Sequence, residues 1–365
     1  MSRPPCAPAL SRRLGGEFAI LVPSIRSQDE IATLARRIGA AVAQPFVVDR
    51  TTINLGVSIG VAVAPNDGKQ ADDLLRRADR ALYRAKAAGR SAVRFFETEM
   101  DAHFERRIQI ERELRRAMDS NVETFVPHYQ PLISLDDDRV IGFEALCRWH
   151  SKSLGFVPPD VFIPIAEETQ LINALGDRLL RQACTDARAW PADLMLAFNV
   201  SAVQLRDPAF GLRVLAILGE TGFDPRRLEI EITETAFVEA VEVVRTVINQ
   251  LRQAGIRIAL DDFGTGYATL SQLLSFEIDK IKIDKSFVSR LDQRENGRVI
   301  VRAILGLAKG FGLTTTAEGV EDKLQLSYLR NHGCTEGQGY LFSKAMPAGD
   351  VAAFLRQSTD ETAAA

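Results

Sequence analysis

The chain has 365 residues, which is long for one ordinary domain and suits two. Its 46% hydrophobic and 25% charged content is typical of a globular protein, and a net charge of -3 gives no general attraction to nucleic acid or anionic membranes. The 4 cysteines lie far apart without a Cys-x-x-Cys pair, which argues against a zinc ribbon or a disulfide scaffold and fits a reducing cytosol. We expect a cytoplasmic location, no membrane contact from this chain, and no DNA or RNA polymer as a partner.

The first part of the chain predicts a small α/β unit with a thin core. Apolar runs predict strands at residues 18–22, 54–63 and 93–96. Amphipathic periodicity predicts helices at residues 28–43 and 72–88. A strongly charged helix follows within residues 97–120. Its charge pattern is typical of a solvated connector between domains.

From residue 124 onward, the pattern changes to alternating strands and helices. We expect strands at residues 125–135, 140–149, 194–200, 228–233, 256–263, 278–287, 313–320 and 337–342. Such alternation is typical of a (β/α)8 barrel. Only residues 136–139 separate the first two strands, which is too short for a crossover, so a hairpin must make one of these strands antiparallel. The sequence therefore predicts an irregular α/β barrel of the TIM type.

Polar side chains occur at the ends of successive predicted strands, where a barrel places its chemistry. They are Glu144, Asn199, Glu231 with Glu234, Asp261 with Asp262, Lys282, Glu318 with Glu321, and Gln338. Buried singly, such groups would each cost several kcal/mol, so they need partners. Mg²⁺ and Mn²⁺ prefer carboxylate and amide oxygens, and the adjacent Asp261 and Asp262 could each contact a different ion of a pair about 4 Å apart.

Taken singly, these residues have structural alternatives. Asn199 could be a turn residue, Glu231 and Glu234 could cap a helix, and the Asp pair could form an acidic turn. Lys282 alternates with two isoleucines and so faces the barrel lumen, where a lysine without carboxylates would be costly. The occurrence of all these residues at one end of the predicted barrel favours a common site.

The motifs of this region resemble those of the EAL family over about residues 105–357. They are Tyr-Gln-Pro (129–131), Gly-Phe-Glu-Ala-Leu-Cys-Arg-Trp (142–149), Asn-Val-Ser (199–201), Glu-Ile-Thr-Glu (231–234), Asp-Asp-Phe-Gly-Thr-Gly-Tyr (261–267), Lys-Ile-Asp (282–284), Ala-Glu-Gly-Val-Glu (317–321) and Gln-Gly-Tyr (338–340). The resemblance implies a metal-dependent phosphodiesterase that opens cyclic di-GMP to the linear dinucleotide pGpG.

The resemblance also implies a role for each matching position. Metal ligands, for two Mg²⁺ or Mn²⁺ ions, would be Glu144, Asn199, Glu231, Asp261 and Asp262. The catalytic group would comprise Lys282, which orients the attacking water, together with Glu318 and Glu321. Contacts with the dinucleotide would come from Gln130, Arg148 and Gln338. Glu234 would steady the loop after Asp262, which the family links to dimer contact, so a homodimer through the barrel is expected.

The N-terminal unit resembles the back half of a GGDEF domain. The similarity lies in Arg-Leu-Gly-Gly-Glu-Phe (13–18), Val-Ser-Ile-Gly-Val-Ala (57–62) and Ala-Asp-Arg-Ala-Leu-Tyr-Arg-Ala-Lys (78–86). The first motif is one acidic residue short of the family pattern, and the front half of the domain is missing. We therefore expect no diguanylate cyclase activity.

The expected organisation has four parts: a partial GGDEF-like unit (1–98), a connecting helix (99–120), an EAL barrel (121–357) and a disordered tail (358–365). Two alternatives to an active enzyme stay open. One is a catalytically silent receptor that binds cyclic di-GMP, although silent members usually lose a metal ligand or the lysine. The other is a nonfunctional product of a truncated gene.

Overall fold

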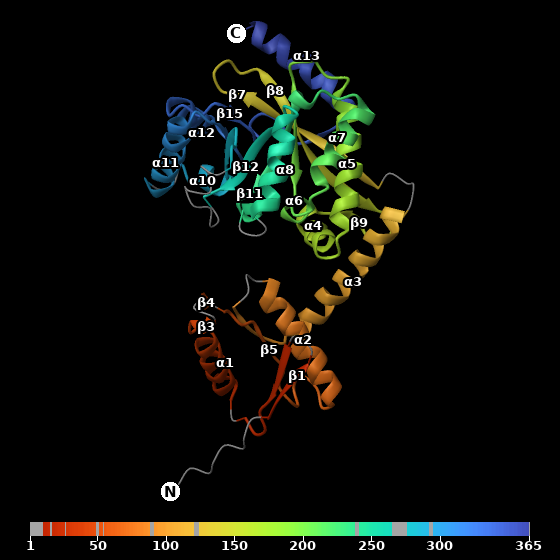
Figure 1. The fold of residues 1–365 in the computed structure, drawn as a ribbon, viewed down its shortest axis with the longest axis vertical. Helices are drawn as coiled ribbons and strands as arrows, with labels where there is room; N and C mark the ends of the chain where they lie inside the picture. Colours follow the sequence, from red (N-terminus) through yellow and green to blue (C-terminus); the bar gives the residue numbers. More distant parts are fainter. Residues whose placement is uncertain are drawn as a thin grey trace. The chain divides into compact units, whose positions relative to one another are not determined.

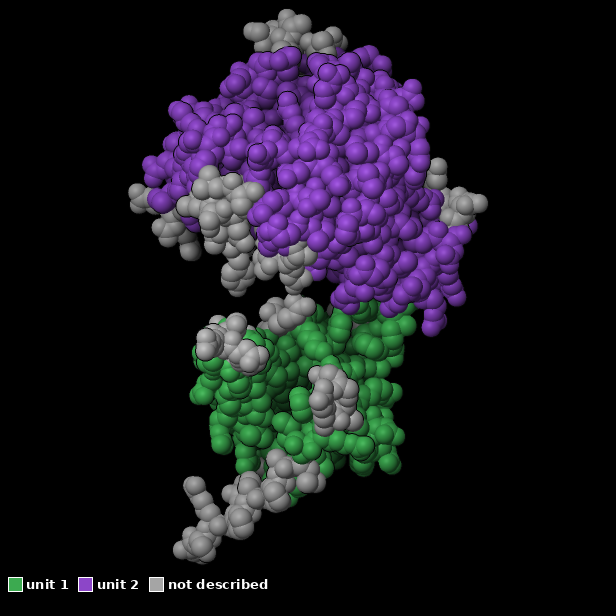
Figure 2. All heavy atoms as spheres, in the orientation of Figure 1, with its two compact units in different colours: residues 1–109 green, residues 110–365 purple. Residues whose placement is uncertain are grey.

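The computed structural model describes residues 10–14, 17–25, 27–48, 51–53, 55–87, 91–119, 124–237, 241–264, 276–291 and 295–364. The chain divides into two compact units, Met1–Gln109 and Ile110–Ala365 (Figure 2). Within the described ranges, no helix is long and apolar enough to cross a membrane.

The described part of the first unit contains short strand pairs and two helices. Its elements are β1 (Leu10–Leu14), β2 (Glu17–Leu21), α1 (Gln28–Val42), β3 (Phe46–Val48), β4 (Thr51–Ile53), β5 (Ile59–Val61), α2 (Ala71–Ala87) and β6 (Val93–Phe95). The pairs β1–β2 and β3–β4 are antiparallel, whereas β5 and β6 are parallel. A small cluster of Ala81, Phe96 and Met100 forms the core, while Phe18 is 72% exposed. The predicted helices are present, but strand 54–63 is reduced to β5, and Asn54 lies outside the described residues.

The charged helix α3 (Thr98–Asp119) contributes residues to both units. Its Ile110 and Leu114 are buried, at 2% and 0% exposure, in the main core of the second unit. The last turns of this helix are therefore packed against the second unit, rather than solvated on all sides as a simple connector would be.

The second unit is built on a closed barrel. Its strands are β7 (Phe125–Ser134), β8 (Val140–Ser151), β9 (Gly155–Val157), β10 (Met195–Val200), β11 (Leu228–Thr233), β12 (Arg257–Phe263), β13 (Lys280–Ile283), β14 (Thr314–Ala317), β15 (Glu336–Gly337) and β16 (Met346–Pro347). The barrel order is β7-β15-β14-β13-β12-β11-β10-β8, and pairing of β7 with β8 closes it. Strand β7 is antiparallel to both neighbours, while the other barrel pairs are parallel. This confirms the predicted irregular barrel with one antiparallel strand.

Helices cover the outside of the barrel (Figure 1). They are α4 (Pro159–Glu168), α5 (Leu171–Ala187), α6 (Ala202–Leu205), α7 (Phe210–Thr221), α8 (Val241–Gln253), α10 (Lys285–Val288), α11 (Glu295–Phe311), α12 (Lys323–Asn331) and α13 (Ala348–Ala364), with 3-10 turns at Pro225–Arg227 and Glu234–Phe237. Their apolar faces pack on the outward-facing strand residues, such as Ile230, Ile258 and Ile281, which are fully buried.

Several element boundaries differ from the sequence-based expectations, and the strand expected at 313–320 is shortened to β14. The strand expected at 278–287 ends at Ile283, because the Asp284 carboxylate accepts the Ser286 N–H and begins helix α10. The strand expected at 337–342 contains only β15, after which the chain turns at Gly339, where an added Cβ would lie 2.1 Å from the Val320 carbonyl oxygen. Helix α13 continues to Ala364 where we expected a disordered tail, since alanine favours helix and neither Gly nor Pro follows Gly349.

Candidate active site

The predicted polar residues converge in the barrel lumen because parallel strands project every second side chain to the same face. Glu144, Asn199, Glu231, Asp261 and Lys282 lie on β8, β10, β11, β12 and β13, and Glu318 and Gln338 directly follow β14 and β15. Among them Glu144, Glu231, Lys282 and Gln338 are buried.

Lys282 occupies the centre of this cluster. Its Nζ lies 2.6 Å from Glu231 Oε2 and 2.6 Å from Glu318 Oε1. Asp261 Oδ1 and Glu144 Oε2 are slightly farther away, at 3.5 Å and 3.7 Å. Burial by itself would lower the pKa of Lys282, but the surrounding carboxylates outweigh it and raise this pKa well above its ordinary value. The lysine therefore remains an ammonium ion that donates to groups from several strands.

Glu144 is fixed by two side-chain amides. Asn199 Nδ2 donates to its Oε1 at 2.5 Å, and Gln338 Nε2 donates to its Oε2 at 2.5 Å. Burial would raise the pKa of Glu144, but Lys282 and these amides lower it below the ordinary value. Glu144 is thus an ionised, oriented carboxylate at one side of the cluster.

Asp261 and Asp262 reach the same cluster through an irregular backbone. Neighbouring residues in a strand normally point to opposite faces. Here Asp262 has a φ of 55°, and the pairing of β12 with β13 shifts register between Leu260 and Phe263. As a result, Asp261, Asp262 and Glu318 each place a carboxylate oxygen within 4.8 Å of the others. The strained conformation is the kind that functional sites retain.

The chemistry of this cluster fits divalent cations. Carboxylates outnumber the single ammonium of Lys282, so the cluster carries excess negative charge in a buried place. Glu231 Oε1 and Gln338 Oε1 are buried without a hydrogen-bond partner in the described ranges, although buried oxygens normally have one. Oxygen ligands of this kind are those that Mg²⁺ and Mn²⁺ prefer.

The carboxyl pKa values give a testable dependence of stability on pH. Burial, followed by the charge of Asp261, raises the pKa of Glu318 to about 8, with Lys282 opposing the shift, and burial together with Asp261 raises that of Asp262 to about 6. A folded state with raised carboxyl pKa values holds more protons than the unfolded state between about pH 4.5 and 8, so stability falls as pH rises through this window. We expect the thermal midpoint of metal-free protein to fall by roughly 5 °C from pH 5 to 8.

Excess Mn²⁺ should largely remove this fall, because bound cations stabilise the ionised carboxylates. Thermal melts followed by circular dichroism, with and without Mn²⁺, measure both effects. A metal-free midpoint that rises steadily from pH 5 to 8 would contradict the environment described for Glu318.

The remaining predicted residues lie around the cluster. Gln130 accepts from Gln338 Nε2 at 3.1 Å and donates to the Ser343 carbonyl oxygen at 3.1 Å. Arg148 lies on β8, four residues beyond Glu144, on the same side of the strand. Glu234 Oε1 accepts the Gly264 N–H at 2.7 Å, at the start of the loop that Glu234 is predicted to stabilise. Residues 265–275 of that loop lie outside the described residues.

Glu321 is the predicted residue that the structure joins least to this cluster. Its backbone N–H donates to Gln325 Oε1 at 2.8 Å in the loop before α12. Within the described ranges, no ion pair links its carboxylate to Lys282. Its assignment to the catalytic group therefore rests on the sequence motif.

Sequence reasoning missed a second buried group in the lumen. Lys280, Glu229 and Glu336 form ion pairs one layer below Lys282. The alternation that placed Lys282 in the lumen also places Lys280 there, two residues earlier on the same strand. This signal was present in the sequence, but no motif contained it.

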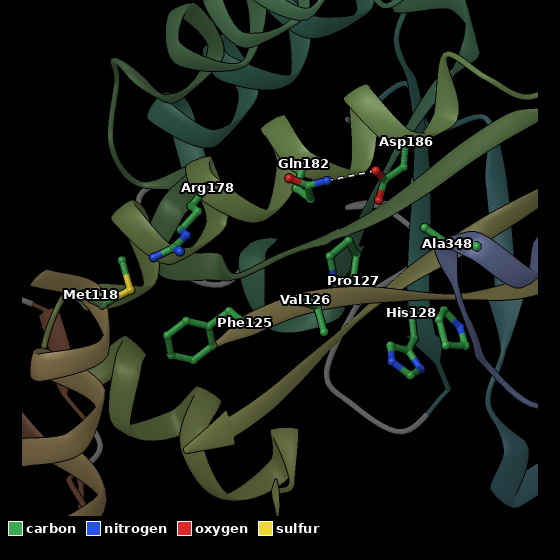
Figure 3. A pocket seen from close by; sticks show the side chains of 11 residues that line it. Met118, Phe125, Val126, Pro127, His128, Arg178, Gln182, Asp186 and Ala348 are labelled. Carbon is green, nitrogen blue, oxygen red and sulfur yellow. Dashed lines mark hydrogen bonds between the residues drawn. The ribbon is translucent and has the colours of Figure 1, made fainter. Parts of the chain in front are cut away.

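A pocket of about 650 Å³ lies on the outside of the barrel, between β7, α5 and the start of α13 (Figure 3). Its polar lining includes Asp186, whose carboxylate already accepts hydrogen bonds from Tyr129 and Gln182. None of the predicted site residues lines it. The pocket and the cluster in the lumen are therefore separate features of this unit.

The fold and the site together define a barrel protein with an acidic lumen suited to divalent cations. Comparisons with known proteins make this specific. The EAL domain family matches residues 111–345, and the diguanylate cyclase, GGDEF domain family matches residues 7–92. The chain therefore belongs to the EAL domain family, and its first unit is similar to the GGDEF domain family.

Individual relatives agree with this assignment. An uncharacterized signaling protein of Caulobacter vibrioides is 44% identical over 344 residues, covering 93% of this chain and 42% of the relative. The bifunctional diguanylate cyclase/cyclic di-GMP phosphodiesterase MucR of Pseudomonas aeruginosa is 34% identical over 345 residues, covering 93% of this chain and 50% of MucR. The chain thus spans half or less of the length of these two relatives.

A solved structure described as the PaMucR phosphodiesterase in complex with c-di-GMP is similar to the barrel. It superposes with a TM-score of 0.64 at 34% identity, covering 67% of this chain and 99% of the other.

Proposed function

We propose that this chain hydrolyses cyclic di-GMP to linear pGpG with two Mg²⁺ or Mn²⁺ ions held in the barrel lumen. The convergence of carboxylates from separate strands around Lys282 is the observation that carries the proposal. The similarity to a phosphodiesterase solved with c-di-GMP supports the choice of substrate.

The side chains divide the work according to their positions. Glu144, Asn199, Glu231, Asp261 and Asp262 would hold the cations. Two bound cations would supply neutralisation of the phosphodiester and an acidified water. Lys282, held between Glu231 and Glu318, would donate a hydrogen bond that orients the attacking water. Glu318, whose pKa is about 8 before cations bind, would accept the proton of that water once it is ionised.

Substrate contacts would come from the rim of the lumen. Arg148 offers a planar fork of donors that suits a phosphate group. Gln130 and Gln338 are hydrogen-bonded to each other and, through Gln338, to Glu144. These hydrogen bonds would connect the bound dinucleotide to Glu144, a proposed cation ligand.

The direct test is product analysis with the purified chain. Cyclic di-GMP is incubated with Mg²⁺ or Mn²⁺, and products are separated by chromatography, with chelator and Glu144→Ala as blanks. Formation of pGpG that both blanks abolish supports the proposal. Binding of cyclic di-GMP without turnover in the parent protein would instead support the receptor alternative.

The proposed homodimer rests on the loop that Glu234 anchors at Gly264. Light scattering coupled to size-exclusion chromatography measures the assembly. A monomer at all accessible concentrations would contradict this part of the proposal.

We expect the GGDEF unit to make no cyclic di-GMP from GTP. The motif is one acidic residue short of the family pattern, and its acidic residue, Glu17, is paired with Lys86 at 2.6 Å. Incubation with GTP and Mg²⁺ should yield no cyclic di-GMP or pGpG, and GTP should leave hydrolysis of cyclic di-GMP unchanged. Product formation that Glu17→Gln removes would overturn this expectation.

A further inference from the structure

A buried ionic layer lies directly below the proposed cation site. Lys280 Nζ lies 2.7 Å from Glu229 Oε1 and 2.7 Å from Glu336 Oε2, and Thr316 Oγ1 donates to the same Glu336 oxygen at 2.7 Å. These four residues, here called the lower layer, are at most 8% exposed. Each charged group therefore has a partner in a place that excludes water.

Each member of the lower layer stands two residues before a residue of the site. Glu229 precedes Glu231, Lys280 precedes Lys282, Thr316 precedes Glu318, and Glu336 precedes Gln338. Residues two apart on a strand project to the same face, so the two layers share one lumen. A shift of any of these strands along its axis would therefore move one residue of the lower layer and one residue of the site together.

The lower layer joins strands that are not hydrogen-bonded neighbours. Lys280 on β13 reaches Glu229 on β11 across β12, where its Cα partner is Ala259. On the other side it reaches Glu336 on β15 across β14. The small Ala259 side chain leaves room for this reach, so one ammonium group links both ends of a five-strand segment, β11 to β15.

Stability alone gives a weak reason for such a layer. Buried ion pairs are costly to desolvate, and packed apolar residues of similar volume are often as stable or more stable. The best-attested use of a buried polar or ionic group is to fix the relative placement of secondary-structure elements. The strands fixed here are those that deliver Glu231, Lys282, Glu318 and Gln338 to the site.

Building on the proposed function, we propose that Lys280 is a positioning residue for the cation site, and that its ion pairs with Glu229 and Glu336 fix the strands that carry the residues above it. Lys280 itself contacts neither substrate nor cation. It acts through the placement of the carboxylates one layer higher.

The sign of the change in cation affinity separates positioning from simple charge. Removing a buried positive charge below the site would by electrostatics alone strengthen Mn²⁺ binding. If Lys280 positions the ligands, Lys280→Met should weaken Mn²⁺ binding by about 10-fold or more, as the loss of groups that support metal ligands does. Titration of metal-free protein with Mn²⁺, followed by electron paramagnetic resonance, measures this without substrate.

Two further variants keep the local net charge constant. Lys280→Met with Glu229→Gln removes one charge of each sign, and should weaken Mn²⁺ binding by about 10-fold. Thr316→Val keeps the shape and suits a strand, but it frees Glu336 from its hydrogen bond and should weaken binding less. The matched control is Arg181→Met with Glu220→Gln, which removes an exposed ion pair of 2.9 Å in the same unit and should change nothing.

Circular dichroism melts identify which variants are folded. Parent-like or tighter Mn²⁺ binding in the folded variants overturns the proposal and leaves the lower layer a structural role only. Weaker binding, together with a lower kcat that added Mn²⁺ partly restores, supports it. A parent protein that binds Mn²⁺ but does not turn over cyclic di-GMP would contradict the proposed function while leaving this test valid.

Discussion

Replacement of Lys282 by methionine is expected to reduce kcat for cyclic di-GMP by about 10²- to 10³-fold, the loss typical of a preorganised donor at a reacting centre. Methionine keeps the length of the side chain but removes the ammonium that lies 2.6 Å from both Glu231 and Glu318. Because this ammonium competes with cations for the same carboxylates, its removal should leave Mn²⁺ binding at least as tight as in the parent protein. The Lys282→Met protein should therefore lose activity without losing affinity for Mn²⁺.

Steady-state kinetics at saturating Mn²⁺ and a Mn²⁺ titration measure the two effects. Lys309→Met is the control, because Lys309 is an exposed lysine on α11, and it should behave like the parent. Full activity of the Lys282→Met protein would show that the lysine is a structural partner of the carboxylates and has no part in turnover.

Neutralisation of Asp261 should have the largest effect on cation binding. Asp261 belongs to the group of three carboxylates within 4.8 Å of one another and also lies 3.5 Å from Lys282. Two unit charges about 4 Å apart interact by about 4 kcal/mol at an effective dielectric constant of about 20. Because Mn²⁺ carries two charges, loss of the carboxylate charge should weaken the affinity for Mn²⁺ by roughly 10³-fold or more. We expect Asp261→Asn to be inactive at cation concentrations that saturate the parent.

Isothermal titration calorimetry with Mn²⁺ measures the affinity directly, and raising Mn²⁺ in the assay should restore part of the activity. Asp193→Asn removes an exposed carboxylate in the turn before β10 and serves as the matched control. Equal Mn²⁺ affinity in Asp261→Asn and the control would remove Asp261 from the cation site.

Much of the barrel could be predicted because its signals are local. Residues 136–139 are too few for a crossover, and the structure has β7 antiparallel to β8, with Gln130 opposite Glu144. The alternation of Lys282 with its isoleucine neighbours correctly placed this side chain in the lumen. The boundaries at β13 and β15 were less predictable, since a helix cap at Asp284 and a turn at Gly339 depend on neighbouring segments.

The sequence by itself determined which side chains face the lumen, because that depends on the two-residue period of a strand and on the order of the elements. Only the tertiary structure decided which of them meet. Lys280 pairs with Glu229 and Lys282 with Glu231, each across 51 residues, and both lysines reach across β12 to do so. Such pairings follow from barrel closure and from the stagger between strands, which no local pattern encodes. The left-handed backbone at Asp262, which brings two neighbouring carboxylates to one place, is likewise set by the packing around it.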